Sequence, residues 1–129
     1  MSRILLFTGG LFALLSVALG AMGAHLLKKH LSDSMLDIFK TGASYQLTQA
    51  LGLILIGVLL QINPKNKMFS VSGILLIIGI VIFSGSLYAY SFTSVVGWAK
   101  ITPIGGLFFL IGWVVFLTGV ARLKKIEGA

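Results

Sequence analysis

The stretch NPKNK, residues 63–67, separates two long apolar segments and indicates how the chain folds. Its proline cannot continue the preceding helix, and its charged residues end the apolar run. Residues 41–64 lie on one side of this stretch and residues 68–99 on the other. Because the connection is so short, the two segments are predicted to form an antiparallel helical hairpin.

Charged residues divide the rest of the chain in the same way. The four apolar windows are residues 4–24, 41–64, 68–99 and 101–121. Each is long enough to cross a bilayer, which takes about 20 helical residues. Only 10% of the 129 residues are charged and 57% are hydrophobic, whereas a soluble domain carries about 25% charge. The sequence therefore predicts an all-α integral membrane protein, an up-down four-helix bundle forming a single domain over residues 1–129.

The first window also fits a secretory signal peptide, because Arg3 precedes an apolar core that ends in small residues. Its length is that of a full span, which favours a retained membrane helix. The third window is longer than a crossing requires. Residues 90–99 are therefore predicted to form an exposed connection, and Thr102 and Pro103 to be the N-cap and first position of the last helix.

Between the first two spans, residues 25–41 combine apolar and polar residues at helical spacing. The apolar positions are Leu31, Met35, Ile38 and Phe39. Ser34 and Asp37 fit a capping box, and Gly42 fits a helix end. An interfacial amphipathic helix is predicted between spans one and two.

Small residues recur every seven positions in each window. They are Gly9, Ser16 and Gly23; Ala43, Ala50 and Gly57; Ser72, Gly79 and Ser86; and Gly105, Gly112 and Gly119. A seven-residue repeat keeps one helix face against its partner, and small residues let the backbones approach. These twelve residues are predicted to lie at helix contacts.

Charge indicates the partners and the orientation. The net charge is +7, but the basic residues stand at the ends of apolar runs, which favours membrane lipids with anionic headgroups over nucleic acid. A homo-oligomer or a membrane protein partner is also possible.

The orientation in the membrane is predicted from the basic residues. One membrane face carries Arg3, Lys65, Lys67, Arg122, Lys124 and Lys125, and the other carries Lys28, Lys29, Lys40 and Lys100. Six against four predicts both termini in the cytoplasm of a multi-pass cell membrane protein.

Several chemistries are disfavoured. The acids Asp33, Asp37 and Glu127 all lie outside the apolar windows, which argues against a proton-coupled exchanger. The chain has no cysteine, and His25 and His30 lack the spacing of a helical zinc pair. No catalytic group, metal site or cofactor is predicted.

The remaining candidates are polar residues that an up-down bundle brings to one membrane face. They are His25, Tyr45, Gln46, Gln49, Ser84, Ser86 and Tyr88. Within the segment FSGSLY, residues 83–88, the small residues allow a close helix approach and the hydroxyls can bond to amides or to His25. The alternative is that the tyrosines belong to an aromatic belt and the glutamines only bond across helices.

Four segments carry a family resemblance: GAMGAHLLKK (20–29), TGASYQLTQAL (41–51), FSGSLY (83–88) and TPIGGLFFLIGW (102–113). In this order they resemble domain-of-unknown-function family 423, also described as transmembrane protein 256-like. The resemblance implies a four-span membrane protein, in bacteria usually of the inner membrane, with no established activity. Where that family usually has a histidine in a YQxxHAL pattern, this chain has Gln49, which weakens any catalytic or metal role there.

The function predicted from the sequence is a non-catalytic membrane module with a polar patch for a lipid, a small ligand or a partner protein. The alternative is an oligomeric channel or passive carrier whose path uses the same polar residues. A membrane enzyme acting on lipid is a third possibility that rests only on the group around His25.

Overall fold

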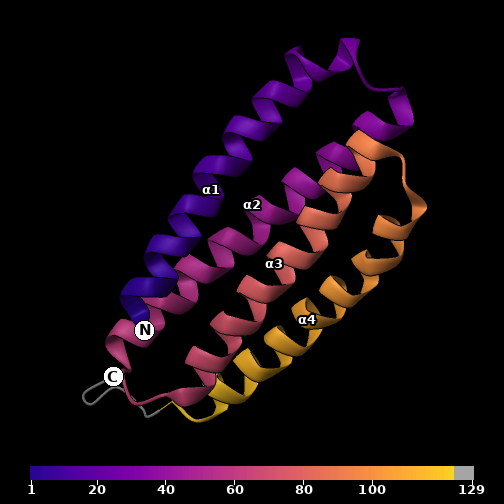
Figure 1. Ribbon diagram of the computed structural model, residues 1–129. Helices are drawn as coiled ribbons and strands as arrows, with labels where there is room; N and C mark the ends of the chain where they lie inside the picture. The colour runs from indigo at the N-terminus through magenta and orange to yellow at the C-terminus, as the bar shows by residue number, and fades with distance from the viewer. Residues whose placement is uncertain (124–129) are drawn as a thin grey trace.

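The computed structural model describes residues 1–123, apart from the side chain of Ala24. Four long helices follow one another: α1 (Ser2–His25), α2 (Asp33–Ile62), α3 (Lys67–Thr93) and α4 (Val96–Ala121). A 3₁₀ helix, η1 (Leu27–Lys29), lies between α1 and α2. The long helices run up and down, and each is long and apolar enough to cross a membrane (Figure 1). The predicted all-α four-span fold is confirmed.

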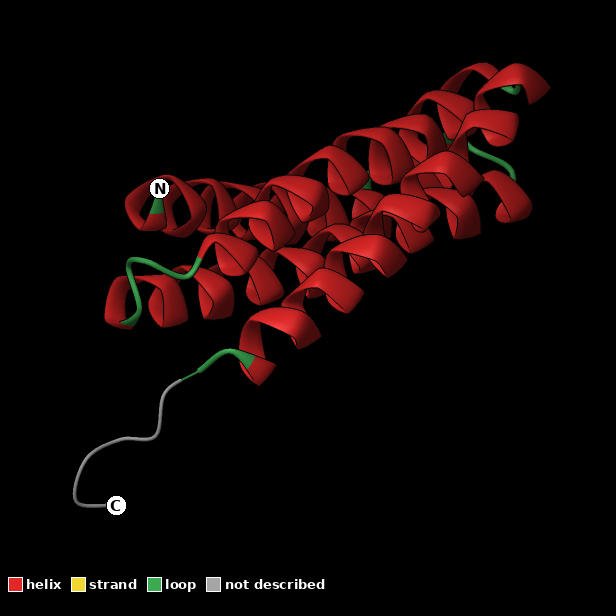
Figure 2. Ribbon diagram, turned by 90° about the horizontal axis from the view of Figure 1, so that it is seen from below, coloured by secondary structure: helices red, strands yellow, loops and turns green. Residues whose placement is uncertain are grey.

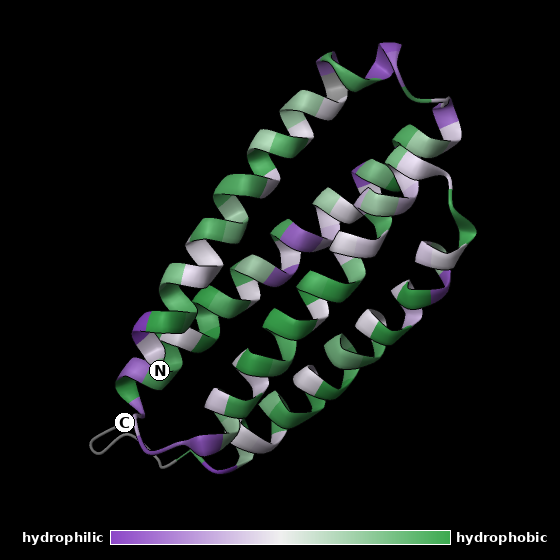
Figure 3. Ribbon diagram, in the orientation of Figure 1, coloured by the Kyte–Doolittle hydropathy of each residue, from purple (hydrophilic) through white to green (hydrophobic). Residues whose placement is uncertain are grey.

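The helices pack mainly in chain order, with α1 on α2, α2 on α3, and α3 on α4 (Figures 1 and 2). Helix α1 also reaches α3, where Leu5 fills the space over Gly73. Hydrophilic residues gather at both ends of the bundle and in a stretch of α2 (Figure 3). The apolar core lies between the helices and includes Leu5, Leu53, Ile56, Leu60, Phe69, Leu76, Ile80 and Phe109.

All twelve small residues of the seven-residue repeats are buried, as predicted. At the closest approach, a Cβ added at Gly105 would overlap the backbone nitrogen of Phe83 and lie 2.7 Å from its Cα. A Cβ at Gly9 would lie 3.0 Å from the carbonyl oxygen of Ala50. The absence of side chains at these points lets the helix backbones come together.

The turn between α2 and α3 is also confirmed, since α2 ends at Ile62 and α3 begins at Lys67. The Asn66 side chain holds this turn in two directions. Its Oδ1 accepts a hydrogen bond from the Phe69 backbone nitrogen at 3.3 Å and caps α3, and its Nδ2 donates to the carbonyl oxygen of Gly119 at 3.0 Å. The hairpin is thereby tied to the end of α4.

The segment between the first two spans differs from the prediction. Helix α2 begins at Asp33, where Ser32, and not Ser34, caps it by accepting a hydrogen bond from the Met35 nitrogen at 3.3 Å. The predicted helix end near Gly42 is wrong, because Gly42 lies inside α2, where its missing side chain makes room for the Tyr88 ring. The amphipathic segment is the first part of α2, and its position in the membrane interface stays a prediction.

The connection between α3 and α4 is shorter than predicted. Helix α3 continues to Thr93, so only Ser94 and Val95 join it to α4, with Ser94 in the left-handed conformation at φ 57°. The hydroxyls of this stretch are satisfied within the helix: Ser91 Oγ donates to the Tyr88 carbonyl and Thr93 Oγ1 to the Ala89 carbonyl.

The predicted start of the last helix at Thr102 is also wrong. Helix α4 begins at Val96, and Pro103 lies within it. Membrane helices tolerate an internal proline where neighbouring hydroxyls and helices satisfy freed polar groups. Here Pro103 follows Thr102, whose Oγ1 lies 2.5 Å from Ser86 Oγ on the neighbouring helix α3.

Candidate functional site

Gln46 joins three helices through one side chain. It is 4% exposed, on the inner face of α2. Its Nε2 donates to the Phe12 carbonyl of α1 at 2.9 Å, and its Oε1 accepts a hydrogen bond from the Tyr88 hydroxyl of α3 at 2.6 Å. The Phe12 carbonyl also accepts a hydrogen bond from Ser16 Oγ at 2.6 Å. Gln46 is therefore the centre of the polar contacts between α1, α2 and α3.

Ser84 and Tyr88, one helical turn apart on α3, both face α2. Ser84 Oγ donates to the Gly42 carbonyl at 2.8 Å. The Tyr88 ring packs over Gly42 and lies 5.2 Å from the Phe39 ring, centroid to centroid. Between them, Gly85 is exposed, and a Cβ added there would meet nothing within 4 Å.

Ser86 does not join this group. Its Oγ lies 2.5 Å from Thr102 Oγ1 on α4 and donates to the Phe83 carbonyl at 2.9 Å. Two residues along a helix correspond to a rotation of about 200°, so Ser84 and Ser86 face opposite neighbours. The expectation that Ser86 faces Gln46 is wrong for this geometric reason.

Gln49 forms a third, separate contact. Its Oε1 accepts a hydrogen bond from Trp113 Nε1 of α4 at 2.9 Å. The Trp113 ring lies over Gly52, whose added Cβ would be 2.7 Å from Cζ2. Trp113 was not predicted from the sequence to take part in these contacts. The local signal for it is Gly52, three residues after Gln49, which makes space for a large ring. At the position where the family pattern has histidine, this chain thus has a glutamine that accepts a hydrogen bond from the Trp113 indole.

The two remaining candidates lie on the surface. Tyr45 is 45% exposed and packs against Phe83 and Phe109, with centroid distances of 4.6 and 6.4 Å. His25 is exposed at the end of α1, away from the Gln46 contacts. The candidates thus form three distinct contacts and two surface residues, not one cluster. Within residues 1–123, every buried side-chain nitrogen and oxygen has a hydrogen-bond partner.

A groove of about 400 Å³ lies between α1 and α3, above the Gln46 side chain. Its α1 wall extends from Phe12 to Met22, and its α3 wall from Ile80 to Tyr88. Gln46 and Ser84 form its floor, and most of the other side chains that line it are apolar. Leu5, packed over Gly73, fills the space between α1 and α3 near the chain end that carries Met1. The groove therefore belongs to the opposite half of the bundle.

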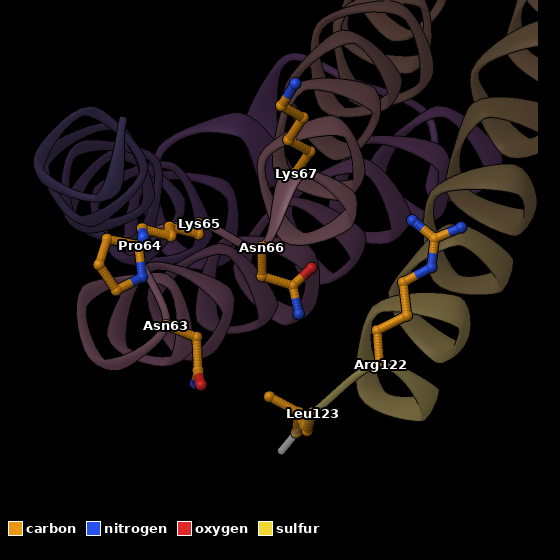
Figure 4. A pocket seen from close by; sticks show the side chains of 7 residues that line it. All are labelled: Asn63, Pro64, Lys65, Asn66, Lys67, Arg122 and Leu123. Atoms are coloured by element: carbon orange, nitrogen blue, oxygen red, sulfur yellow. The ribbon is translucent and has the colours of Figure 1, made fainter.

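A second hollow, of about 480 Å³, lies at the other end, where the α2–α3 turn meets the end of α4. Its lining includes Lys65, Lys67 and Arg122 (Figure 4). The charged ends of the three basic side chains lie apart from one another, and the Asn66 amide at the centre of the hollow is already bonded to the Gly119 carbonyl. This arrangement does not direct several charges at one point.

Among the residues that the structure describes, no three histidine or acidic side chains are grouped so as to hold a metal ion.

Four spanning helices with buried polar contacts between them define a small polytopic membrane protein. The chain belongs to the family described as Protein of unknown function (DUF423), whose sequence pattern matches residues 19–106. That description assigns the family no catalytic activity.

Relatives cover almost the whole chain. A UPF0382 membrane protein of Staphylococcus epidermidis is 41% identical over 122 residues, covering 95% of this chain and 97% of the relative. The UPF0382 inner membrane protein YgdD of Escherichia coli is 37% identical over 124 residues, covering 96% and 94%. The UPF0382 membrane protein YwdK of Bacillus subtilis is 36% identical over 120 residues, covering 93% and 98%. No solved structure matches the chain. The chain is thus a multi-pass membrane protein of a family of unknown function.

Proposed function

We propose that this protein is a non-catalytic membrane module that holds one acyl chain of a membrane lipid in the groove between α1 and α3. The observation that carries the proposal is the groove itself: it lies between two membrane-spanning helices and its walls are largely apolar. A groove of this kind opens sideways to lipid, so a lipid chain can enter it without leaving the bilayer.

The length of the groove fits one leaflet. Its α1 wall extends over the ten helical steps from Phe12 to Met22, which is about 15 Å at about 1.5 Å per residue. Half of a hydrocarbon core of about 30 Å is the same length. One acyl chain of one leaflet matches this span.

The polar floor is compatible with an apolar occupant. The Gln46 amide bonds to Phe12 and Tyr88, and the Ser84 hydroxyl bonds to the Gly42 carbonyl. Since these groups have protein partners, covering them with a hydrocarbon chain does not leave them unpaired, which would cost about 1 to 3 kcal/mol per group. The occupant need not supply a hydrogen bond.

The same pairing supports a binding role over a channel or a passive carrier. Such a path needs polar groups in succession across the membrane, whereas Gln46, Gln49 and Ser86 each bond at a different helix contact. An enzyme acting on lipid would rest on His25 alone, since no histidine, lysine or acidic side chain of the described residues lines the groove. These placements support the non-catalytic proposal.

Filling the groove should displace the lipid. Gly85 lines it, and a side chain added there meets no protein atom within 4 Å, so Gly85→Phe should occupy the groove without unfolding the bundle. We expect native mass spectrometry of the protein, extracted gently from membranes, to show one retained lipid in the wild type and none in Gly85→Phe.

The matched control is Gly10→Phe, because Gly10 is also exposed on a spanning helix, has equally open space, and does not line the groove. It should keep the lipid. Retention of the same lipid by Gly85→Phe would contradict the proposal, as would finding only a small soluble ligand or a second copy of the chain at this position.

The proposed orientation places both termini in the cytoplasm, on the lysine and arginine count given above. The chain has no cysteine, so single cysteines can be introduced without background labelling. With Lys65→Cys in the α2–α3 turn and Val95→Cys in the α3–α4 connection, a membrane-impermeant maleimide should label intact cells only at position 95. Labelling only at position 65 would reverse the orientation.

A further inference from the structure

We infer that the lipid in this groove is an anionic phospholipid whose phosphate lies beside Lys28 and Lys29. The inference rests on the proposed function, because it names the class of lipid bound at the same site. It follows from where the groove ends, which charges stand there, and how the opposite end of the bundle differs.

The groove leads to one end of the bundle only. Leu5, packed over Gly73, fills the space between α1 and α3 toward the end that carries Met1. At the other end the walls reach Met22 and Tyr88, which lie three residues before the end of α1 and five before the end of α3. A chain lying in the groove therefore carries its headgroup beyond Met22.

The first residues beyond that wall are basic. The α1 helix passes through Leu26 into η1, whose Lys28 and Lys29 are both exposed. His25, the last residue of α1, is exposed as well and can donate a hydrogen bond to a phosphate oxygen. A headgroup that leaves the groove along α1 thus meets two lysines and a histidine, and all three side chains are exposed.

The other charges at this end leave the balance positive. Lys40 on α2 and Lys100 on α4 add to Lys28 and Lys29, while Asp33 and Asp37 on the first turns of α2 are the acidic residues there. Four lysines against two aspartates attract a negatively charged headgroup. The aspartates belong to α2, so the α1 side of the groove mouth carries only basic charge in residues 25–30.

The opposite end provides a contrast within the same molecule. Lys65, Lys67 and Arg122 line a hollow there, but Leu5 closes the space between α1 and α3 on that side. The hollow there does not continue into a groove between α1 and α3. Among residues 1–123, the end with Lys28 and Lys29 is the one that combines basic residues with such a groove.

The test uses delipidated full-length protein in a neutral detergent, titrated with phosphatidylglycerol or phosphatidylcholine of identical acyl chains and followed by native mass spectrometry. We expect phosphatidylglycerol to bind at least tenfold more tightly. The double variant Lys28→Gln, Lys29→Gln should weaken phosphatidylglycerol binding by about fivefold per charge, corresponding to about 1 kcal/mol each, and leave phosphatidylcholine unchanged. Lys65→Gln, Lys67→Gln is the control and should change neither.

The outcomes separate this inference from the proposed function. If both lipids bind equally and Gly85→Phe blocks both, the groove holds a chain but the anionic preference is overturned. If phosphatidylglycerol is preferred but the preference disappears in the Lys65, Lys67 variant instead, the location is overturned. If neither lipid binds, or if Gly85→Phe changes nothing, both the inference and the proposed function fail. Melting curves of each variant check that the exposed substitutions leave the fold intact.

Discussion

Replacing Gly105 by alanine should lower the free energy of unfolding by about 3 kcal/mol or more, the largest effect expected from any single methyl group in this chain. The added Cβ would overlap the Phe83 backbone nitrogen and lie 2.7 Å from the Phe83 Cα. A side chain can rotate away from such a clash, but the backbone of α3 cannot, so α3 and α4 must separate. Reversible unfolding in mixed micelles measures the loss.

Matched substitutions distinguish this clash from a general effect of removing glycine. Gly10→Ala and Gly85→Ala add the same methyl group where nothing lies within 4 Å, and helix propensity should make each neutral or stabilising by about 0.5 to 1 kcal/mol. Gly112→Ala should fall between these extremes, because its nearest neighbour is the flexible Leu76 side chain at 3.0 Å. Equal stability for the Gly105 and Gly10 variants would show that α3 and α4 do not approach as described.

The second large effect is expected for Gln46→Leu. This change removes the hydrogen bonds to the Phe12 carbonyl and from the Tyr88 hydroxyl, and leaves that hydroxyl without its partner. Each bond between membrane helices contributes about 0.6 kcal/mol, and leaving the half-buried Tyr88 hydroxyl unpaired adds to this up to about 1 kcal/mol, so a loss of about 2 kcal/mol is expected in the same unfolding measurement.

A double-mutant cycle identifies the cause of that loss. Tyr88→Phe removes only the hydroxyl, so in the Gln46→Leu background it should cost less than in the wild type, with a coupling of about 0.5 to 1 kcal/mol. Ser86→Ala is the control, because Ser86 bonds to Thr102 and to its own helix. Its effect should add to that of Gln46→Leu. Coupling with Ser86 and none with Tyr88 would mean that α3 is rotated relative to this structure.

The features that the sequence predicted correctly depend on spacing along one helix. The turn at Asn63–Asn66 and the buried faces of the helices follow from local composition and from a repeat that any straight helix must obey. No partner needs to be known to infer that Gly105 and Gly112 share a face. Local rules alone were therefore sufficient for the span count and the contact faces.

The features that were wrong depend on what a neighbouring helix supplies. Thr102 and Pro103 have the residue types of a helix start, yet α4 passes through them and Thr102 lies beside Ser86 on α3. Likewise, Gln46 and Ser86 are at similar depth, but whether they meet depends on the rotation of α3 about its axis. Trp113 reaches Gln49 from a helix 64 residues away in sequence. Such pairings require three-dimensional information.

The order in which the helices pack has a consequence for biogenesis. Because α1 lies on α2, α2 on α3 and α3 on α4, nearly every contact joins segments that are synthesised one after the other. Such a topology has low contact order and avoids long loop closures before contacts form. Each new span can therefore dock on the one inserted just before it, and Gln46 completes its bonds to α1 and α3 only when the third span arrives. This packing order allows the first three helices to pack together before the last one is synthesised.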